Sequence, residues 1–190
     1  DRYIAIWIIW KRFLNSPKQF IIPIYQRTYS WTIKQCEQLW KDIIRTGSDD
    51  TISGHFIGSI VYVEKGLYQV SALPKLLVID GQQRLTTVSL VLAALCNLAK
   101  KRHTHTDFNQ DRLMSYYLLN DKEEWEEKYK LILTRSDKTA LFTVIDNRDL
   151  TTDESIRIQE NYTFFTEQLE KSDLSVVFNG ISKLFIIDVS

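Results

Sequence analysis

A short apolar run that leads directly into a helical pattern restricts the fold of this chain more than any other feature. Leu76–Ile79 predicts a buried strand, and Asp80-Gly81 predicts a turn at its end, because glycine adopts backbone conformations closed to other residues. After the turn, apolar residues recur at helical spacing, namely Val88, Val91, Leu92, Leu95 and Leu98. The chain is therefore expected to hold a strand–turn–helix unit with polar residues at the junction.

The remaining patterns predict helices and strands that do not alternate regularly. The expected helices are Tyr3–Leu14, Thr32–Gly47, Asp107–Leu119, Lys138–Ile145 and Glu154–Lys171. The expected strands are Gln19–Ile24, Phe56–Val63, Tyr129–Leu133 and Leu184–Val189. Because this order contains no regular series of βαβ units, we predict the α+β class, with a small mixed sheet, surrounding helices and a mostly helical second half.

Single residues mark several of these boundaries. Thr32 and Gln35 have the spacing of a capping box, and Gly47 is expected to end the helix that Thr32 begins. Pro23 cannot donate a hydrogen bond to a neighbouring strand, so its run is expected to be an edge strand or an extended entry to the sheet. The two clearest helical stripes predict burial of Trp40, Ile43, Val88, Leu92 and Leu95.

Length and composition exclude several classes of protein. The chain has 190 residues, enough for one module with a core, and its 24 basic residues balance 24 acidic ones. A neutral chain is not expected to hold DNA by bulk charge alone. Cys36 and Cys96 are too few for a disulfide scaffold or a zinc site, and they predict buried, reduced thiols. Reduced thiols indicate a cytoplasmic protein, and the run Tyr3–Trp10 is too short to cross a membrane, so no membrane partner is expected.

The junction Asp80-Gly81-Gln82-Gln83-Arg84 holds the densest set of polar residues in the chain. A helix N-terminus offers unpaired N–H groups and a partial positive charge, both of which favour phosphate. The glycine allows a ligand to approach closely, the arginine can grip a phosphate, and the aspartate can hold Mg²⁺ directly or through water. Either glutamine could orient a water molecule against phosphorus. The plainer alternative is that these residues only cap the helix.

A second polar segment, Ile22–Trp31, delivers Gln26 and Arg27 into a turn between aromatic residues. If Arg27 and Arg84 meet across one pocket, their repulsion is relieved only when an anion lies between them. The plainer alternative for this segment is a surface arginine beside core aromatics.

Other constellations carry little weight. His103 and His105, with Asp107 nearby, lack further metal ligands and predict a solvated loop. His55 precedes a strand and is expected either to line the pocket or to be an ordinary surface histidine. The glycine-rich Walker pattern that many nucleotide-binding proteins use has no match in this chain.

Taken together, the two polar segments resemble a known family. The chain contains three blocks similar to the signatures of GmrSD-type restriction endonuclease N-terminal domains, in the same order: Pro23-x-Tyr25-Gln26-Arg27-x-Tyr29-x-Trp31, Phe56-x-Gly58-Ser59-Ile60 and Asp80-Gly81-Gln82-Gln83-Arg84-Leu85-Thr86-Thr87. The segment Arg157-Ile158-x-x-Asn161-Tyr162 resembles a later and weaker block of the same family. The resemblance implies a fold near the ParB and sulfiredoxin group.

The resemblance also implies nucleotide binding and, in several members, hydrolysis of a nucleoside triphosphate during bacterial defence against foreign or modified DNA. A separate C-terminal nuclease domain, in the same chain or in a partner subunit, would cut the DNA. The chain opens on Asp1 and lacks the family's usual segment after the last strand, so we expect an N-terminal module of a longer protein. Residues 1–105 are expected to form the nucleotide-binding core, and residues 106–190 a helical extension that returns to a final strand.

Residues and resemblance together predict one site with three groups of side chains. Catalysis is assigned to Asp80, which would hold Mg²⁺ or order the attacking water, and to Gln83 as the second candidate for placing that water. The phosphates of a nucleoside triphosphate are expected to meet Gln26, Arg27, Gly81, Gln82, Arg84 and Thr86. The candidates for contact with the base or with a DNA modification are Tyr25, Tyr29 and Trp31. Two alternatives remain open: a DNA-sensing domain without hydrolysis, and a non-catalytic interaction scaffold.

Overall fold

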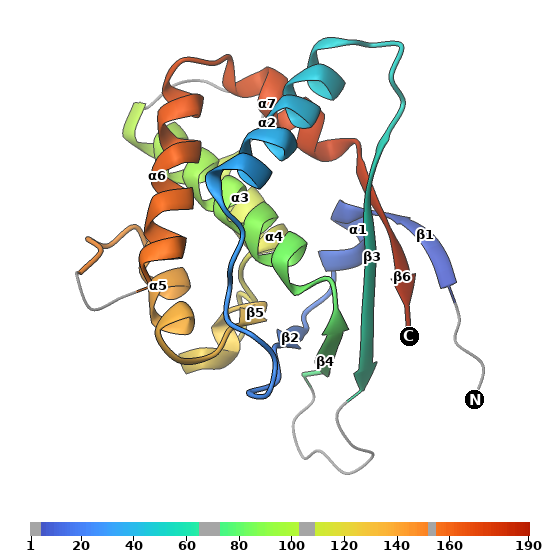
Figure 1. Ribbon diagram of the computed structural model, residues 1–190, viewed down its shortest axis with the longest axis vertical. Helices are drawn as coiled ribbons and strands as arrows, with labels where there is room; N and C mark the ends of the chain where they lie inside the picture. The colour runs from blue at the N-terminus through green and yellow to red at the C-terminus, as the bar shows by residue number, and fades with distance from the viewer. Residues whose placement is uncertain (1–4, 65–72, 103–108, 152–154) are drawn as a thin grey trace.

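The computed structural model describes residues 5–64, 73–102, 109–151 and 155–190, and the strands in these residues form one mixed sheet (Figure 1). The strands are β1 (Ala5–Ile9), β2 (Gln19–Ile21), β3 (His55–Glu64), β4 (Lys75–Asp80), β5 (Leu131–Ile132) and β6 (Leu184–Val189). Their order across the sheet is β1-β6-β3-β4-β2-β5. β1 and β6 run antiparallel, as do β3 and β4, whereas the other neighbouring pairs are parallel.

The helices that accompany this sheet gather mainly on one side of it (Figure 1). They are α1 (Trp10–Leu14), α2 (Ile33–Ser48), α3 (Gln82–Arg102), α4 (Gln110–Tyr117), α5 (Arg135–Ile145), α6 (Ile156–Glu170) and α7 (Leu174–Ser182), with a 3₁₀ turn at Trp125–Lys128. A mixed sheet with helices packed against it confirms the predicted α+β class. The division at residue 105 stays a prediction. Residues after it supply β5 and β6 to the same sheet as the strands before it.

Helix α3 is the centre of the hydrophobic core. Every side chain from Leu85 to Ala99 is buried, so the helix is covered on all faces rather than along one stripe. It packs against α4, α5 and α6, and its first turns approach β3. The five residues chosen from the helical stripes are all buried as predicted: Trp40, Ile43, Val88, Leu92 and Leu95.

In the first part of the chain one prediction is wrong, and one of two alternatives is excluded. The run expected to be one helix from Tyr3 forms strand β1 at Ala5–Ile9, and helix α1 begins only at Trp10. A continuous apolar run does not distinguish strand from helix, and here β6 lies alongside it and pairs antiparallel. Of the two alternatives for the run that contains Pro23, the edge strand is wrong, because β2 pairs with both β4 and β5. Pro23 lies beyond Ile21, where β2 ends, and leaves the pairing intact.

Gly47 does not end its helix as predicted. It lies in the last turn of α2, and a Cβ there would stand 2.0 Å from the carbonyl oxygen of Val176 in α7. Gly180 of α7 shows the reciprocal feature, since its Cβ would stand 2.1 Å from the carbonyl oxygen of Ile43. These two glycines therefore allow α2 and α7 to pack closely. Helix α7 was not anticipated from the sequence.

The start of α2 and the two cysteines match the sequence predictions. At the predicted capping box, the Oε1 of Gln35 accepts a hydrogen bond from the Thr32 N–H at 2.7 Å. Cys36 and Cys96 are buried free thiols, as predicted. The candidate loop with His103, His105 and Asp107 lies outside the described residues. Within the described ranges, none of the helices combines the length and apolarity needed to cross a membrane.

Candidate functional site

The turn between β4 and α3 can be formed only by glycine. Gly81 has a φ of +98°, a conformation that L side chains rarely adopt. A Cβ there would also stand 2.5 Å from Cδ1 of Ile60 and 2.8 Å from the carbonyl oxygen of Ser59. The turn therefore lies directly against β3, and α3 begins at Gln82, immediately after it. This confirms the predicted strand–turn–helix junction.

A second glycine makes room for Arg84. Gly58 lies in β3 at a register irregularity opposite β6, with a φ of +124°. The Arg84 side chain lies across this glycine, because a Cβ on Gly58 would stand 2.5 Å from Nε and 2.7 Å from Cζ of the arginine. The two sequence blocks that contain these residues are thus parts of one surface.

Arg27 and Arg84 line the same cavity, as predicted from their sequence segments. This polar cavity has a volume of about 410 Å³. Its lining residues are Gln26, Arg27, Trp31, Ile79, Asp80, Gly81, Gln82, Gln83 and Arg84. Within the described part of the chain, neither arginine forms an ion pair. The exposed carboxylate of Asp80 is the acidic group in this lining.

The amide of Gln26 is held by the end of β4. Its Nε2 donates to the carbonyl oxygens of Val78 at 2.7 Å and Ile79 at 3.1 Å. Because both partners are acceptors, the nitrogen must face them, and Oε1 is the end that can meet a ligand. Gln26 therefore offers an acceptor to the polar cavity rather than the donor that a phosphate requires.

The other two glutamines fasten the segment before α2 to the start of α3. Gln83 Oε1 accepts hydrogen bonds from the backbone N–H groups of Ser30 at 2.8 Å and Trp31 at 3.2 Å. Gln82 Nε2 donates to the carbonyl oxygen of Arg27 at 2.9 Å. By the same logic of donors and acceptors, Gln83 has its Nε2 donor left for a ligand and Gln82 its Oε1 acceptor. In Figure 1 the connecting segment runs from β2 up to α2 beside α3.

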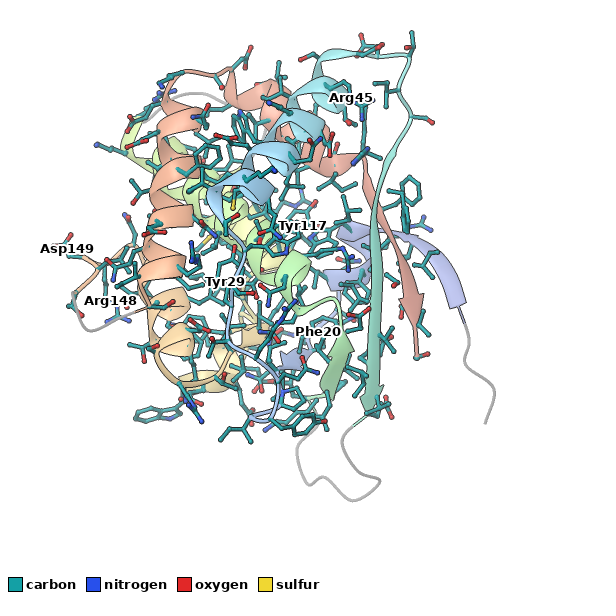
Figure 2. All side chains as sticks on the ribbon, viewed as in Figure 1. Phe20, Tyr29, Arg45, Tyr117, Arg148 and Asp149 are labelled. Atoms are coloured by element: carbon teal, nitrogen blue, oxygen red, sulfur yellow. The ribbon has the colours of Figure 1, made fainter. Side chains whose placement is uncertain are left out.

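Tyr29 is a core residue that supports the site through buried hydrogen bonds. It is 3% exposed and lies inside the molecule in Figure 2. Asn161 Nδ2 donates to its hydroxyl at 2.8 Å, and the hydroxyl contacts Thr87 Oγ1 at 2.7 Å. Since Thr87 donates its own proton to the carbonyl oxygen of Gln83, the tyrosine must donate to Thr87. Burial raises the pKa of Tyr29, which keeps the phenol protonated for this bond.

Two residues of the sequence-predicted site consequently do not reach the polar cavity. Tyr29 has its ring in the core, and Thr86 is fully buried on the first turns of α3. Neither residue lines the polar cavity, and the ligand contacts assigned to them from the sequence stay predictions. Tyr25 has the opposite placement: it is 76% exposed, beside Ile24 at 74%, on the turn that carries Gln26. Trp31 is the aromatic residue of the predicted set that lines the polar cavity.

Sequence reasoning missed most of the residues that position this segment. The Tyr29 N–H donates to the buried carboxylate of Asp137 in α5 at 2.8 Å. Asn161 in α6 donates to the carbonyl oxygen of Trp31 at 2.8 Å as well as to Tyr29. The only available signal was the weak block around Asn161, because Asp137 lies in no recognisable motif.

A second cavity adjoins the first. This aromatic cavity has a volume of about 300 Å³ and shares Trp31 and Arg84 with the polar cavity. Its lining residues are Trp31, Gln35, Gln38, Leu39, Asp42, His55, Phe56, Ile57, Arg84 and Val88. The two cavities are thus separated by one tryptophan and one arginine.

His55 lines the aromatic cavity with both ring nitrogens engaged. Its Nδ1 lies 3.3 Å from an amino group of Arg45, labelled near the end of α2 in Figure 2, and its Nε2 lies 3.3 Å from Oδ2 of Asp42. Arginine can only donate, so Nδ1 accepts and Nε2 carries the proton that is donated to the carboxylate. His55 is therefore a structural partner of Asp42 rather than a free base.

Metal binding at this site would depend on the ligand. Among the described residues, no group of three or more histidine, cysteine and acidic side chains is arranged to hold a metal ion. Asp80 alone fits the way in which proteins bind Mg²⁺ with one or two carboxylates, the remaining ligands being phosphate oxygens and water. The residues present therefore suit a metal ion that arrives with a nucleotide.

A known protein family matches most of the chain. The sequence model of the GmrSD restriction endonuclease N-terminal domain matches residues 10–190. The chain belongs to this family. None of the curated proteins matches it with significance. In this GmrSD-type domain, the residues of the three main signature blocks come together around the two adjoining cavities, with Gly58 and Arg84 in contact and Gln26, Gln82 and Gln83 joining the first block to the third.

Proposed function

We propose that this GmrSD-type domain binds a nucleoside triphosphate with its phosphates in the polar cavity and hydrolyses it. In a restriction system, this cycle would regulate a C-terminal nuclease domain that acts on DNA. The observation that carries the proposal is the convergence of Arg27 and Arg84, without ion-pair partners among the described residues, beside the first turn of α3. Two guanidinium groups and a set of helix N–H groups form a strong anion site.

Charge balance supports a polyphosphate as the ligand. The whole chain is neutral, with 24 basic and 24 acidic residues, so it attracts a highly charged anion only where cations are concentrated. The two arginines of the polar cavity provide such a concentration, opposed by the single carboxylate of Asp80. A bound triphosphate would relieve the repulsion between the arginines, and Mg²⁺ would relieve the repulsion between Asp80 and the phosphates.

The hydrogen bonds of the glutamines redistribute the roles assigned from the sequence. Gln83 has a donor nitrogen left, which suits a phosphate oxygen, whereas the sequence suggested that it positions water. Gln26 has an acceptor oxygen left, which suits an attacking or metal-bound water. Hydrolysis then requires positioning and charge stabilisation more than covalent chemistry, with Asp80 holding the metal ion. Mg²⁺ would supply charge neutralisation to the phosphates.

The direct test is calorimetric titration of the protein with ATP, combined with a phosphate-release assay. Arg84→Ala and Arg27→Ala are each expected to lower the affinity, because each removes a charge-assisted contact with phosphate. Asp80→Ala is expected to reduce turnover more than binding. Arg12→Ala is the matched control, since Arg12 is exposed and lies outside both cavities. Unchanged affinity in a folded Arg84→Ala protein would remove the phosphate-clamp role.

A second candidate function is recognition of DNA without hydrolysis. The observation that favours it is the exposed pair Ile24 and Tyr25, 74% and 76% exposed, on the turn next to Gln26 and Arg27. Such side chains can stack on bases or enclose a modified group beside a phosphate-binding pocket. A salt titration of DNA binding distinguishes the two functions, because backbone contacts give an affinity that falls steeply with salt. A non-catalytic scaffold would bind neither ligand.

A further inference from the structure

We infer that an anion bound in the polar cavity holds the connecting segment, residues 22–32, against α3, α5 and α6, and that Asn161 is a positioning residue for this anion although it does not line the cavity. The inference rests on the proposed function only in so far as phosphate binds in the polar cavity. It adds a regulatory link, because occupation of the cavity and attachment of the segment to the second half of the chain strengthen each other.

The connecting segment is held by side chains of other elements. It joins β2 to α2 beside α3 (Figure 1), and its residues, all of them described, form no helix or strand. The Tyr29 N–H donates to Asp137 in α5 at 2.8 Å, and the Trp31 carbonyl oxygen accepts from Asn161 in α6 at 2.8 Å. Attachments of this kind can open locally while the helices stay folded, so the segment has an attached and a released state.

Gln83 of α3 holds the same segment and faces the polar cavity at the same time. Its Oε1 accepts from the N–H groups of Ser30 at 2.8 Å and Trp31 at 3.2 Å, which leaves Nε2 for a ligand in the cavity that Gln83 lines. If the amide were turned round, its NH₂ group would face two N–H donors. An anion that accepts from Nε2 therefore favours the orientation in which the segment is attached.

Arg27 makes the attachment depend on charge. It belongs to the connecting segment and lines the polar cavity, whereas Arg84, which lines the same cavity, belongs to α3. Without an anion the two guanidinium groups repel each other, and this repulsion opposes the attached state. An anion between them attracts both and joins the segment to α3. Because release would remove Arg27 from the cavity, the attached state is also the state that binds an anion more tightly.

The contacts of the segment with α6 extend this coupling into the second half of the chain. Asn161 donates to the Tyr29 hydroxyl as well as to Trp31, and Tyr29 lies inside the molecule in Figure 2. Coupling between two equilibria is reciprocal, so contacts that hold the segment raise the affinity for the anion, and the anion strengthens those contacts. α6 therefore responds to occupation of a cavity that it does not line.

The first test is hydrogen–deuterium exchange of the wild-type protein, with inorganic tripolyphosphate and Mg²⁺ as the probe and calorimetry as the measure of binding. We expect the amides of residues 29–31 to exchange about 5–150-fold more slowly with the anion bound, the usual range of coupling between two sites. The amides of residues 50–53, which lie outside the polar cavity, are the internal reference and should exchange at an unchanged rate.

The second test separates the two sides of the segment with variants. Gln83→Glu keeps an acceptor for the Ser30 and Trp31 N–H groups but removes the donor, so it should weaken tripolyphosphate binding while residues 29–31 stay protected without ligand. Asn161→Leu should weaken tripolyphosphate binding about fivefold or more in protein that circular dichroism shows to be folded, and saturating anion should restore the protection of residues 29–31. Thr163→Ala is the matched control, since Thr163 is exposed on the same helix and outside the cavity.

The outcomes distinguish this inference from the proposed function. If calorimetry detects binding of neither tripolyphosphate nor ATP, the proposed function fails and the inference fails with it. If tripolyphosphate binds but residues 29–31 exchange at the same rate with and without it, the phosphate site stands and the coupling is wrong. If folded Asn161→Leu binds tripolyphosphate as tightly as the wild type, Asn161 has only a structural role. Should Asn161→Leu not fold, the exchange of the wild-type protein decides the matter.

Discussion

Arg84 crosses the backbone of Gly58 so closely that a Cβ on the glycine would stand 2.5 Å from the arginine Nε. This contact joins β3 to the first turn of α3 and sets the position of the guanidinium between the two cavities. The glycine in the second signature block therefore serves the arginine in the third. Its positive φ of +124° adds a second reason why no other residue fits there.

Replacement of Gly58 by alanine is predicted to damage both stability and binding. The methyl group would meet the guanidinium, and the residue would have to keep a φ that alanine disfavours, at a cost of about 1–3 kcal/mol. The free energy of unfolding, from urea denaturation, and the affinity for a nucleotide should both fall. Gly54→Ala is the control, because its Cβ would meet the ring of Phe185 at 3.1 Å and the carbonyl oxygen of Lys183 at 3.4 Å, without a positive φ. Equal losses in the two variants would contradict the displacement of Arg84.

Asn161 is predicted to stabilise the site through Tyr29. Asn161→Leu removes donors to the Tyr29 hydroxyl and to the carbonyl oxygen of Trp31, and it should lower the free energy of unfolding by about 1–3 kcal/mol. Tyr29→Phe removes the hydroxyl alone. A double-mutant cycle should show a coupling energy of about 0.5–3 kcal/mol, as residues in direct contact do. Additive losses would show that the hydrogen bond contributes nothing.

Leu92 is predicted to be among the most sensitive core positions. It is 1% exposed on α3, which is buried on all sides, so Leu92→Ala should lower the free energy of unfolding by about 2–5 kcal/mol. Ile156→Ala is the control, because Ile156 is 68% exposed at the start of α6 and should cost less than about 0.5 kcal/mol. Denaturant melts of the two variants measure both values. A loss below about 1 kcal/mol for Leu92→Ala would disprove its burial.

Alkaline pH is predicted to destabilise the fold through Cys96. Burial raises the pKa of Cys96 from 9.0 to about 12, so above pH 9 the unfolded chain loses a proton that the folded chain keeps. This contribution to stability is complete below pH 9 and is lost as the pH rises towards 12. At one pH unit above 9 the loss is about 1.4 kcal/mol. Cys96→Ala should therefore lose less stability than the wild type between pH 8 and 10.

That comparison must be made as a difference between two proteins. Burial lowers the pKa of Lys130 to about 8, so the unfolded chain holds more protons above that pH and stability rises there. This effect opposes that of the thiol and is present in both proteins. It cancels in the difference between wild type and Cys96→Ala. Identical pH dependence of the two proteins would show that Cys96 does not retain its proton in the folded state.

Local patterns were enough to predict the strand–turn–helix junction. The apolar run Leu76–Ile79, the glycine after it and the helical spacing that follows all depend on residues close together in the chain. They correspond to β4, the Gly81 turn and α3. The convergence of Arg27 and Arg84 was also predictable, because the family resemblance links their two segments.

The roles of the individual polar groups depend on partners far away in sequence. Tyr29 and Asn161 are separated by 132 positions, yet their hydrogen bond decides that the tyrosine lies in the core and not in the cavity. Each glutamine of the site has one end fixed by a backbone group of another segment, and only the tertiary structure shows which end is left. An amide has one donor end and one acceptor end, so composition and spacing cannot tell which of them a ligand would meet.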